Sequence, residues 1–169
     1  MASDLFYHDA LRALADAGVR FVVVGGVAVN LQGVPRFTAD LDVAVAVGAD
    51  IGRAARALGP LALQCRLPVT QEQLDDAATV ASWIEERNLR AINFVDPSSP
   101  LRQVDLVIAS PVPYDEIEAT AATMEAGGLA IRVASIDVLI RMKDGTGRAQ
   151  DASDIVALRR VREIERGDV

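Results

Sequence analysis

A pair of adjacent glycines, Gly25-Gly26, interrupts a short apolar segment and constrains the local fold more than any other feature. The preceding residues, Phe21 to Val24, are aromatic and β-branched, which predicts a buried strand. Val27 to Gln32 suits a short helix that ends at Gly33. Glycines between a strand and a helix let a ligand approach the backbone, and the new helix offers free N–H groups to an anion. The pair is therefore either a phosphate-binding turn or a tight turn without a ligand.

Two carboxylates follow the glycine pair after thirteen residues, within the alternating segment Asp40 to Val47. Residues i and i+2 of a strand point the same way, about 6–7 Å apart. Paired carboxylates repel each other unless a cation lies between them, and Mg²⁺ prefers oxygen ligands. The pair predicts a metal site or, alternatively, two solvated acids at a strand end. The predicted faces are Leu41, Val43, Val45 and Val47 on one side, and Asp40, Asp42, Ala44 and Ala46 on the other.

A third carboxylate, Asp105, has a similar setting in the segment Gln103 to Ile108. Val104, Leu106 and Ile108 share one face of this predicted strand, so Asp105 lies on the opposite, polar face. If the two acidic strands are neighbours, three carboxylates converge. Three acids can hold two metal ions about 3.5–4 Å apart, the arrangement used for in-line phosphoryl transfer. Spacing alone does not make the strands neighbours, so their pairing is a hypothesis.

These residues together resemble a known family. Gly25-Gly26, Arg36, Thr38, Asp40-Leu41-Asp42 and Val104-Asp105-Leu106 look like the nucleotidyltransferase superfamily, which has the DNA polymerase β-like fold. The pattern is similar to that of AbiEii-like and other minimal nucleotidyltransferases. A later block strengthens the resemblance, which covers residues 21 to 158: Lys143 is followed by Gly147, Arg148, Asp151 and Asp154.

The resemblance implies an α+β fold, with a mixed, mostly antiparallel sheet flanked by helices. It implies that Asp40, Asp42 and Asp105 are catalytic and bind Mg²⁺, two ions in all, and that Asp105 also serves as general base. The predicted contacts to a nucleoside triphosphate (NTP) are Gly25, Gly26, Arg36, Thr38, Lys143, Arg148 and Asp151. Asp151 would orient a basic group, while Arg36 and Thr38 either contact the nucleotide or only structure the loop before Asp40. One departure is that Gly26 stands where related enzymes often have serine.

Composition bounds the remaining possibilities. The chain has 169 residues, of which 51% are hydrophobic, so we expect one domain over residues 1–169 with a helical portion from about 135 to 169. A single cysteine, Cys65, forms no internal disulfide, and no secretory signal or membrane-spanning run is visible, so a cytoplasmic location is expected. His8 is the only histidine and is expected on the surface. The net charge of −7 argues against a broad RNA-binding surface but leaves room for a local basic groove.

Turn and capping signals predict the remaining elements, although residues 60 to 88 show few of them. The predicted helices run from Leu5 to Ala17, from Ile51 to Leu58 after an Asp50 cap, from Thr70 to Leu74, from Asp115, from Ser135 to Lys143, and from an Asp151 cap onward. Leu89 to Val95 is a predicted strand, and Gly127-Gly128 marks a hairpin. Residues 144 to 150 form a predicted hinge.

The sequence thus predicts a Mg²⁺-dependent nucleotidyltransferase that moves a nucleoside monophosphate (NMP), for instance from ATP, to an acceptor hydroxyl or phosphate. Three acceptor classes stay open. The first is RNA such as a tRNA end, in a toxin-antitoxin enzyme with a cognate antitoxin. The others are a small hydroxylated molecule of the aminoglycoside or lincosamide type and a protein side chain. A non-catalytic nucleotide- or metal-binding module is the alternative from a different class.

Overall fold

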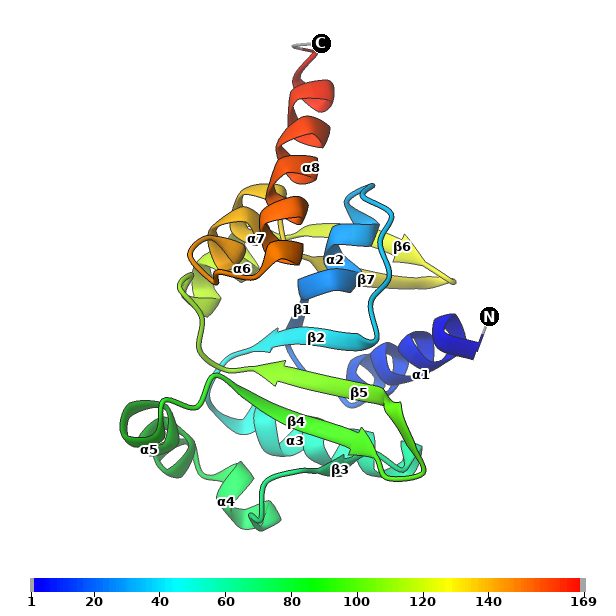
Figure 1. Cartoon of the computed structure of the whole chain (residues 1–169). Helices are drawn as coiled ribbons and strands as arrows, with labels where there is room; N and C mark the ends of the chain where they lie inside the picture. The colour runs from blue at the N-terminus through cyan, green and yellow to red at the C-terminus, as the bar shows by residue number, and fades with distance from the viewer. Residues whose placement is uncertain (1, 168–169) are drawn as a thin grey trace.

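A mixed β-sheet forms the centre of the computed structural model, which describes residues 2–167 (Figure 1). Within these residues the sheet has seven strands in the order β3-β4-β5-β2-β1-β7-β6. The pairs β2–β5 and β1–β7 are parallel, and the other four are antiparallel. This mostly antiparallel sheet confirms the predicted fold class. The strands are β1 (Phe21–Val24), β2 (Asp40–Val45), β3 (Gln64–Cys65), β4 (Ala91–Asp96), β5 (Ser99–Val107), β6 (Ala122–Ala126) and β7 (Leu129–Val133).

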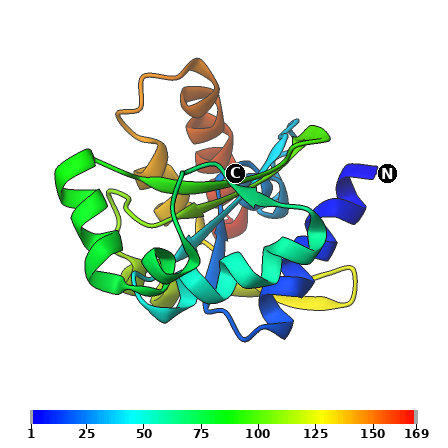
Figure 2. The same cartoon turned by 90° about the horizontal axis from the view of Figure 1, so that it is seen from below.

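Helices flank this sheet on both sides. Figures 1 and 2 show α1 and α3 on one side of β4 and β5, while α7 and α8 lie beyond β2 and next to α2. No helix among the described residues has the length and apolar character needed to cross a membrane. The helices are α1 (Ala2–Asp16), α2 (Gly25–Leu31), α3 (Ala49–Leu58), α4 (Gln71–Asp75), α5 (Ala77–Arg87), α6 (Tyr114–Thr120), α7 (Ile136–Lys143) and α8 (Ala149–Arg166), with a 3-10 turn at Gly59–Leu61.

The two faces of the sheet differ in burial along β4 and β5. Alternate residues are fully buried beneath the helices, because successive side chains of a strand point to opposite faces. Buried side chains are Ile92, Phe94, Val104 and Leu106. Their neighbours Asn93, Val95, Gln103, Asp105 and Val107 are half-buried. The second set therefore lies on an open face of the sheet, and that face carries the acidic residue Asp105.

Several predicted boundaries were wrong. Helix α2 begins at Gly25 itself, so both glycines belong to its first turn rather than to a separate loop. Strand β2 ends at Val45, and Val47 is 37% exposed instead of sharing the apolar face. Asp50 was predicted to cap α3 but lies inside the helix, because Gly48 occupies the capping position. The Asp50 side chain pairs with Arg53 at 2.6 Å instead.

Capping residues explain where the other helices begin. Thr70 forms the capping box of α4, and Ser135 caps α7, both as predicted. Helix α5 was not predicted; Asp76 caps it by accepting hydrogen bonds from the backbone at Ala78 and Thr79. Asp151 does not cap α8, because that helix already begins at Ala149 and the Asp151 side chain turns toward the protein interior.

Candidate active site

The three predicted carboxylates lie on two neighbouring strands. Asp42 on β2 stands directly opposite Asp105 on β5, in a parallel pair, and Asp40 stands opposite Gln103. On its other side, Asp42 stands opposite Val24, the last residue of β1 before the glycine pair. The hypothesis that the two acidic strands are neighbours is therefore confirmed, and the acids meet where β1 gives way to α2.

Mutual repulsion and burial mark this acidic cluster. Burial, reinforced by the charges of Asp105 and Asp40, raises the pKa of Asp42 to about 7, although Lys143 and Arg148 oppose the shift. Burial and the charge of Asp105 also raise the pKa of Asp40. Neither side chain forms a hydrogen bond with another described residue. Two such carboxylates fit a divalent cation, which would relieve their repulsion.

Asp105 differs from the other two acids because amide groups hold it. Asn93 Nδ2 donates to its Oδ1 at 2.9 Å, and Gln103 Nε2 donates to both of its oxygens at 2.8 and 3.1 Å. Within residues 2–167, no group of three or more acidic, histidine or cysteine side chains is arranged to hold a metal ion as it stands. The hydrogen bonds from the Asn93 and Gln103 amides direct the Asp105 carboxylate toward these two side chains. Oδ2 of Asp105 accepts only one of these bonds, so it keeps a lone pair that a shared ion could use.

The glycine pair leaves room for the residues around it. Gly25 has a φ of +63°, and a Cβ built there would lie 2.0 Å from Oδ2 of Asp42. A Cβ at Gly26 would lie 2.5 Å from Oγ1 of Thr38. Close packing therefore requires glycine at both positions, against the acidic strand at Gly25 and against the loop before it at Gly26. The Thr38 contact also explains the departure from serine, because Thr38 occupies the space that a side chain at position 26 would need.

Alanine at Gly25 is expected to weaken both stability and the acidic site. The left-handed backbone and the collision with Asp42 together should cost about 2–4 kcal/mol in the free energy of unfolding. Gly18→Ala is the matched control, because Gly18 has a similar φ of +69° but a Cβ added there would meet no atom within 4 Å. It should cost only about 1 kcal/mol. Urea denaturation measures both values, and equal losses would contradict the proposed packing.

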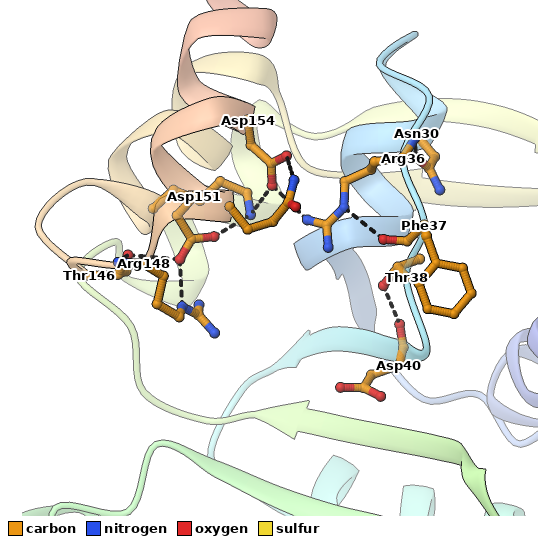
Figure 3. A network of polar contacts seen from close by, with 11 residues as sticks. Asn30, Arg36, Phe37, Thr38, Asp40, Thr146, Arg148, Asp151 and Asp154 are labelled. Atoms are coloured by element: carbon orange, nitrogen blue, oxygen red, sulfur yellow. Dashed lines mark hydrogen bonds and ion pairs between the residues drawn. The ribbon is translucent and has the colours of Figure 1, made fainter.

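A buried ionic network joins α7 to α8 beside the acids. Lys143 Nζ lies 2.9 Å from both Asp151 Oδ1 and Asp154 Oδ2. Thr146 Oγ1 and Arg148 Nε donate to the second oxygen of Asp151 at 2.7 and 2.6 Å (Figure 3). Burial by itself would raise the pKa values of Asp151 and Asp154, but hydrogen bonds from Lys143 and their other partners lower both. Both acids therefore stay ionised and hold the cations in place.

The same network reaches the loop before β2. Arg36 Nη1 lies 2.6 Å from Asp154 Oδ2, and the backbone N–H of Arg36 donates to Asn30 Oδ1 at 2.9 Å. Thr38 Oγ1 donates to the carbonyl oxygen of Asp40 at 3.3 Å, and Figure 3 shows Thr38 on the loop that leads from Arg36 to Asp40. Arg36 and Thr38 thus connect the C-terminal helices to the start of the acidic strand.

Cavities lie between the acids and the C-terminal helices. A cavity of about 150 Å³ is lined by Gly25 and Asp42 on one side and by Lys143 and Arg148 on the other. It adjoins a larger one of about 660 Å³, since Val107, Met142 and Arg148 line both. Arg148 is 74% exposed and uses only its Nε for Asp151, so the rest of its guanidinium group is open to these cavities. Four of the predicted site residues therefore meet around one space: Gly25, Asp42, Lys143 and Arg148. The remaining predicted residues do not line either cavity: Gly26, Arg36, Thr38, Asp40, Asp105 and Asp151.

Sequence reasoning assigned no role to Asn93, Gln103 or Asp154. Asp154 had a usable signal, because it lies three residues after Asp151 and so shares its face of a helix. Gln103 lies two residues before Asp105 and on the same face of the strand, which also could have been read from the sequence. Asn93 had no such signal, since only the register of β4 against β5 places it beside Asp105.

Solved structures with a similar fold are nucleotidyltransferase-like. One is an antigenic nucleotidyltransferase-like protein from Paracoccidioides brasiliensis, with a TM-score of 0.54, 18% identity, and coverage of 92% of this chain and 75% of that one. Another is a Thermotoga maritima protein that has been assigned as a nucleotidyltransferase. Its TM-score is 0.52 at 15% identity, and the match covers 94% of this chain and 88% of that one. These likenesses establish that the chain has a nucleotidyltransferase-like fold.

A third similar structure is the antibiotic-resistance factor ANT(2'')-Ia in complex with adenylyl-2''-tobramycin. Its TM-score is 0.60 at 12% identity, and the match covers 99% of each chain. Searches against models of protein families and against curated proteins found no match. Identities this low show a shared fold, so any function must be inferred from the geometry of the site.

Proposed function

We propose that this protein is a Mg²⁺-dependent nucleotidyltransferase that transfers an NMP from an NTP to an acceptor hydroxyl. The observation that carries the proposal is the position of Asp42 opposite Asp105, beside a cavity lined by Gly25, Lys143 and Arg148. Carboxylates on one side of a space and cations on the other suit a metal-bound triphosphate. The nucleotidyltransferase-like fold supports the same assignment.

Each group has a role in this proposal. Asp40 and Asp42 would hold Mg²⁺, and Asp105 would complete the site for a second ion. Bound metal would neutralise phosphate charge and lower the pKa of the attacking hydroxyl. The exposed guanidinium of Arg148 would contact the triphosphate, with Asp151 fixing its Nε. Lys143 would add positive charge from within the ionic network.

The glycine pair and Thr38 would lie against the phosphates. Gly25 lines the cavity and has no side chain, so the backbone can approach a phosphate oxygen. The Thr38 hydroxyl lies within the space that a residue 26 side chain would fill. It can therefore replace the hydroxyl that serine supplies in related enzymes. Arg36 would act through Asp154 by holding this loop in place.

The adjoining cavity of about 660 Å³ has the size of a small-molecule site and would hold the nucleoside. The acceptor would then approach Asp105 from the other side. An RNA end, a toxin-antitoxin role with an antitoxin partner, and membership of the AbiEii-like group remain sequence-based proposals. The adenylyl-tobramycin complex of ANT(2'')-Ia supports a small-molecule acceptor as the second candidate.

Calorimetric titration with a non-hydrolysable NTP tests this function directly. Wild type should bind the nucleotide only with Mg²⁺, and the double variant Asp40→Asn/Asp42→Asn should lose that binding. Asp16→Asn, an exposed acid on α1, is the control and should bind as wild type does. Failure to bind any of the four NTPs, or unchanged Mg²⁺-dependent binding by the double variant, would refute the proposed site.

A further inference from the structure

The open face of the sheet continues past Asp105 into a second groove. This groove has a volume of about 360 Å³, and Gln64, Arg66, Val95 and Gln103 are among its lining residues. Gln103 also donates to both oxygens of Asp105, so the groove begins directly at the acidic cluster. It lies on strands β3, β4 and β5, whereas the cavities assigned to the NTP lie between Gly25 and the C-terminal helices.

The charge of this groove comes from Arg66. Its side chain is exposed and forms no hydrogen bond or ion pair with another described residue. Other arginines are paired with acids; Arg53 with Asp50 and Arg141 with Glu116 are examples. The backbone N–H of Arg66 donates to the carbonyl oxygen of Asn93, whose side chain bonds to Asp105. The exposed Arg66 guanidinium is therefore available to a ligand that reaches from this groove to Asp105.

The groove offers no competing free carboxylate. Its one acidic lining residue, Asp96, is buried and accepts hydrogen bonds from Ser98 Oγ at 2.6 Å and Arg102 Nη1 at 2.9 Å. The remaining polar lining residues, Gln64 and Gln103, carry neutral amides. A guanidinium with amide donors suits a phosphate, while a polycation would find no carboxylate here to bind.

We infer that the groove around Arg66 is the acceptor site and takes an acceptor whose reacting hydroxyl lies close to a phosphate group. This inference rests on the proposed function, because it uses Asp105 as the meeting point of acceptor and metal. Arg66 binds the acceptor phosphate, and the acceptor hydroxyl lies at Asp105. The hydroxyl oxygen attacks the α-phosphorus of the NTP, its proton passes to a base, and pyrophosphate leaves.

Two sources provide this chemistry: the 3′ end of a nucleic acid strand and a phosphorylated small molecule. Phe37 gives the means to distinguish them. It is 84% exposed and lies on the loop just before Asp40, which stands opposite Gln103 (Figure 3). Exposed aromatic rings stack on nucleobases, so a nucleic acid would use Phe37 and a sugar phosphate would not.

Acceptor binding by the full chain with Mg²⁺ tests the inference. The probes are a fluorescent single-stranded oligonucleotide with a free 3′ hydroxyl, a fluorescent sugar phosphate, and fluorescent tobramycin as the polycation. Arg66→Glu should weaken binding of the phosphate-bearing probe about tenfold or more, and Arg66→Ala should lower the oligonucleotide salt slope by about 1. Arg87→Glu is the matched control, because Arg87 is exposed on α5 and has no partner among the described residues.

The outcomes separate the two proposals. Loss of probe binding in Arg66→Glu, with Mg²⁺-dependent NTP binding unchanged, supports the acceptor site. If Phe37→Ala then weakens only the oligonucleotide, the source is a nucleic acid end. The inference is overturned if wild type still binds NTP but binds neither phosphate-bearing probe, whether or not it binds tobramycin. If wild type itself does not bind NTP in the presence of Mg²⁺, the proposed function is refuted instead.

Discussion

Asp42→Asn is expected to raise the free energy of unfolding at about pH 8 by about 2–4 kcal/mol when no divalent metal is present. The reason is the raised pKa of Asp42, about 7 in the folded chain, which results from burial and from repulsion by Asp105 and Asp40. Asparagine keeps the shape of the side chain but carries no charge. The folded protein therefore no longer confines a carboxylate among two others.

The sign of the pH dependence follows from linkage. The folded chain binds the Asp42 proton more tightly than the unfolded chain does, so stability falls as the pH rises from about 4 to about 7. The advantage of Asp42→Asn should thus be small near pH 4 and full near pH 8. Urea denaturation with a chelator across this range measures it.

Added Mg²⁺ supplies the decisive comparison. At about pH 8 it should stabilise wild type by binding the folded state, and it should stabilise Asp42→Asn far less. The variant should also lose nucleotide transfer, so it would be more stable and inactive at once. Asp137→Asn, an exposed acid on α7, serves as the control and should change neither property. A pH-independent difference, or full activity in Asp42→Asn, would contradict the assigned electrostatics.

Asp154→Ala is expected to destabilise the protein by about 3–5 kcal/mol, because it leaves two cations short of a buried partner. Asp154 is 2% exposed and pairs with both Lys143 and Arg36 at 2.9 and 2.6 Å. Lys143 keeps Asp151, whereas Arg36 has no second carboxylate among its contacts with described residues. The loop that carries Arg36 and Thr38 should therefore loosen, and NTP affinity should fall with stability.

A surface pair provides the matched control for this variant. Asp137→Ala removes the partner of Arg162 on the same two helices, but Asp137 is largely exposed. Its removal should cost less than about 1 kcal/mol, since water replaces the lost contact. A similar small loss in Asp154→Ala would show that the network does not hold the helices. Because hydrogen bonds and charge lower the pKa of Asp154, its contribution is present above about pH 4 and is lost as the pH falls further.

Much of the acidic site was predictable from the sequence, for a local reason. Strand alternation alone places Asp40 and Asp42 on one face, and the glycine pair marks a strand-to-helix change. Hydrogen-bonding residues likewise located the starts of α4 and α7, because Thr70 and Ser135 bond to backbone only a few residues away. Such signals lie within one element and need no knowledge of the rest of the fold.

The tertiary structure decided which elements meet. Sequence spacing could not show that β5 pairs with β2 in the register that puts Asp105 beside Asp42. Nor could it show that α8 carries Asp154 to Arg36, a residue 118 positions away, since that contact depends on how α8 packs. Capping hydrogen bonds and the alternation of side chains along a strand depend on neighbouring residues. The register between strands and the packing of helices depend on the assembled core.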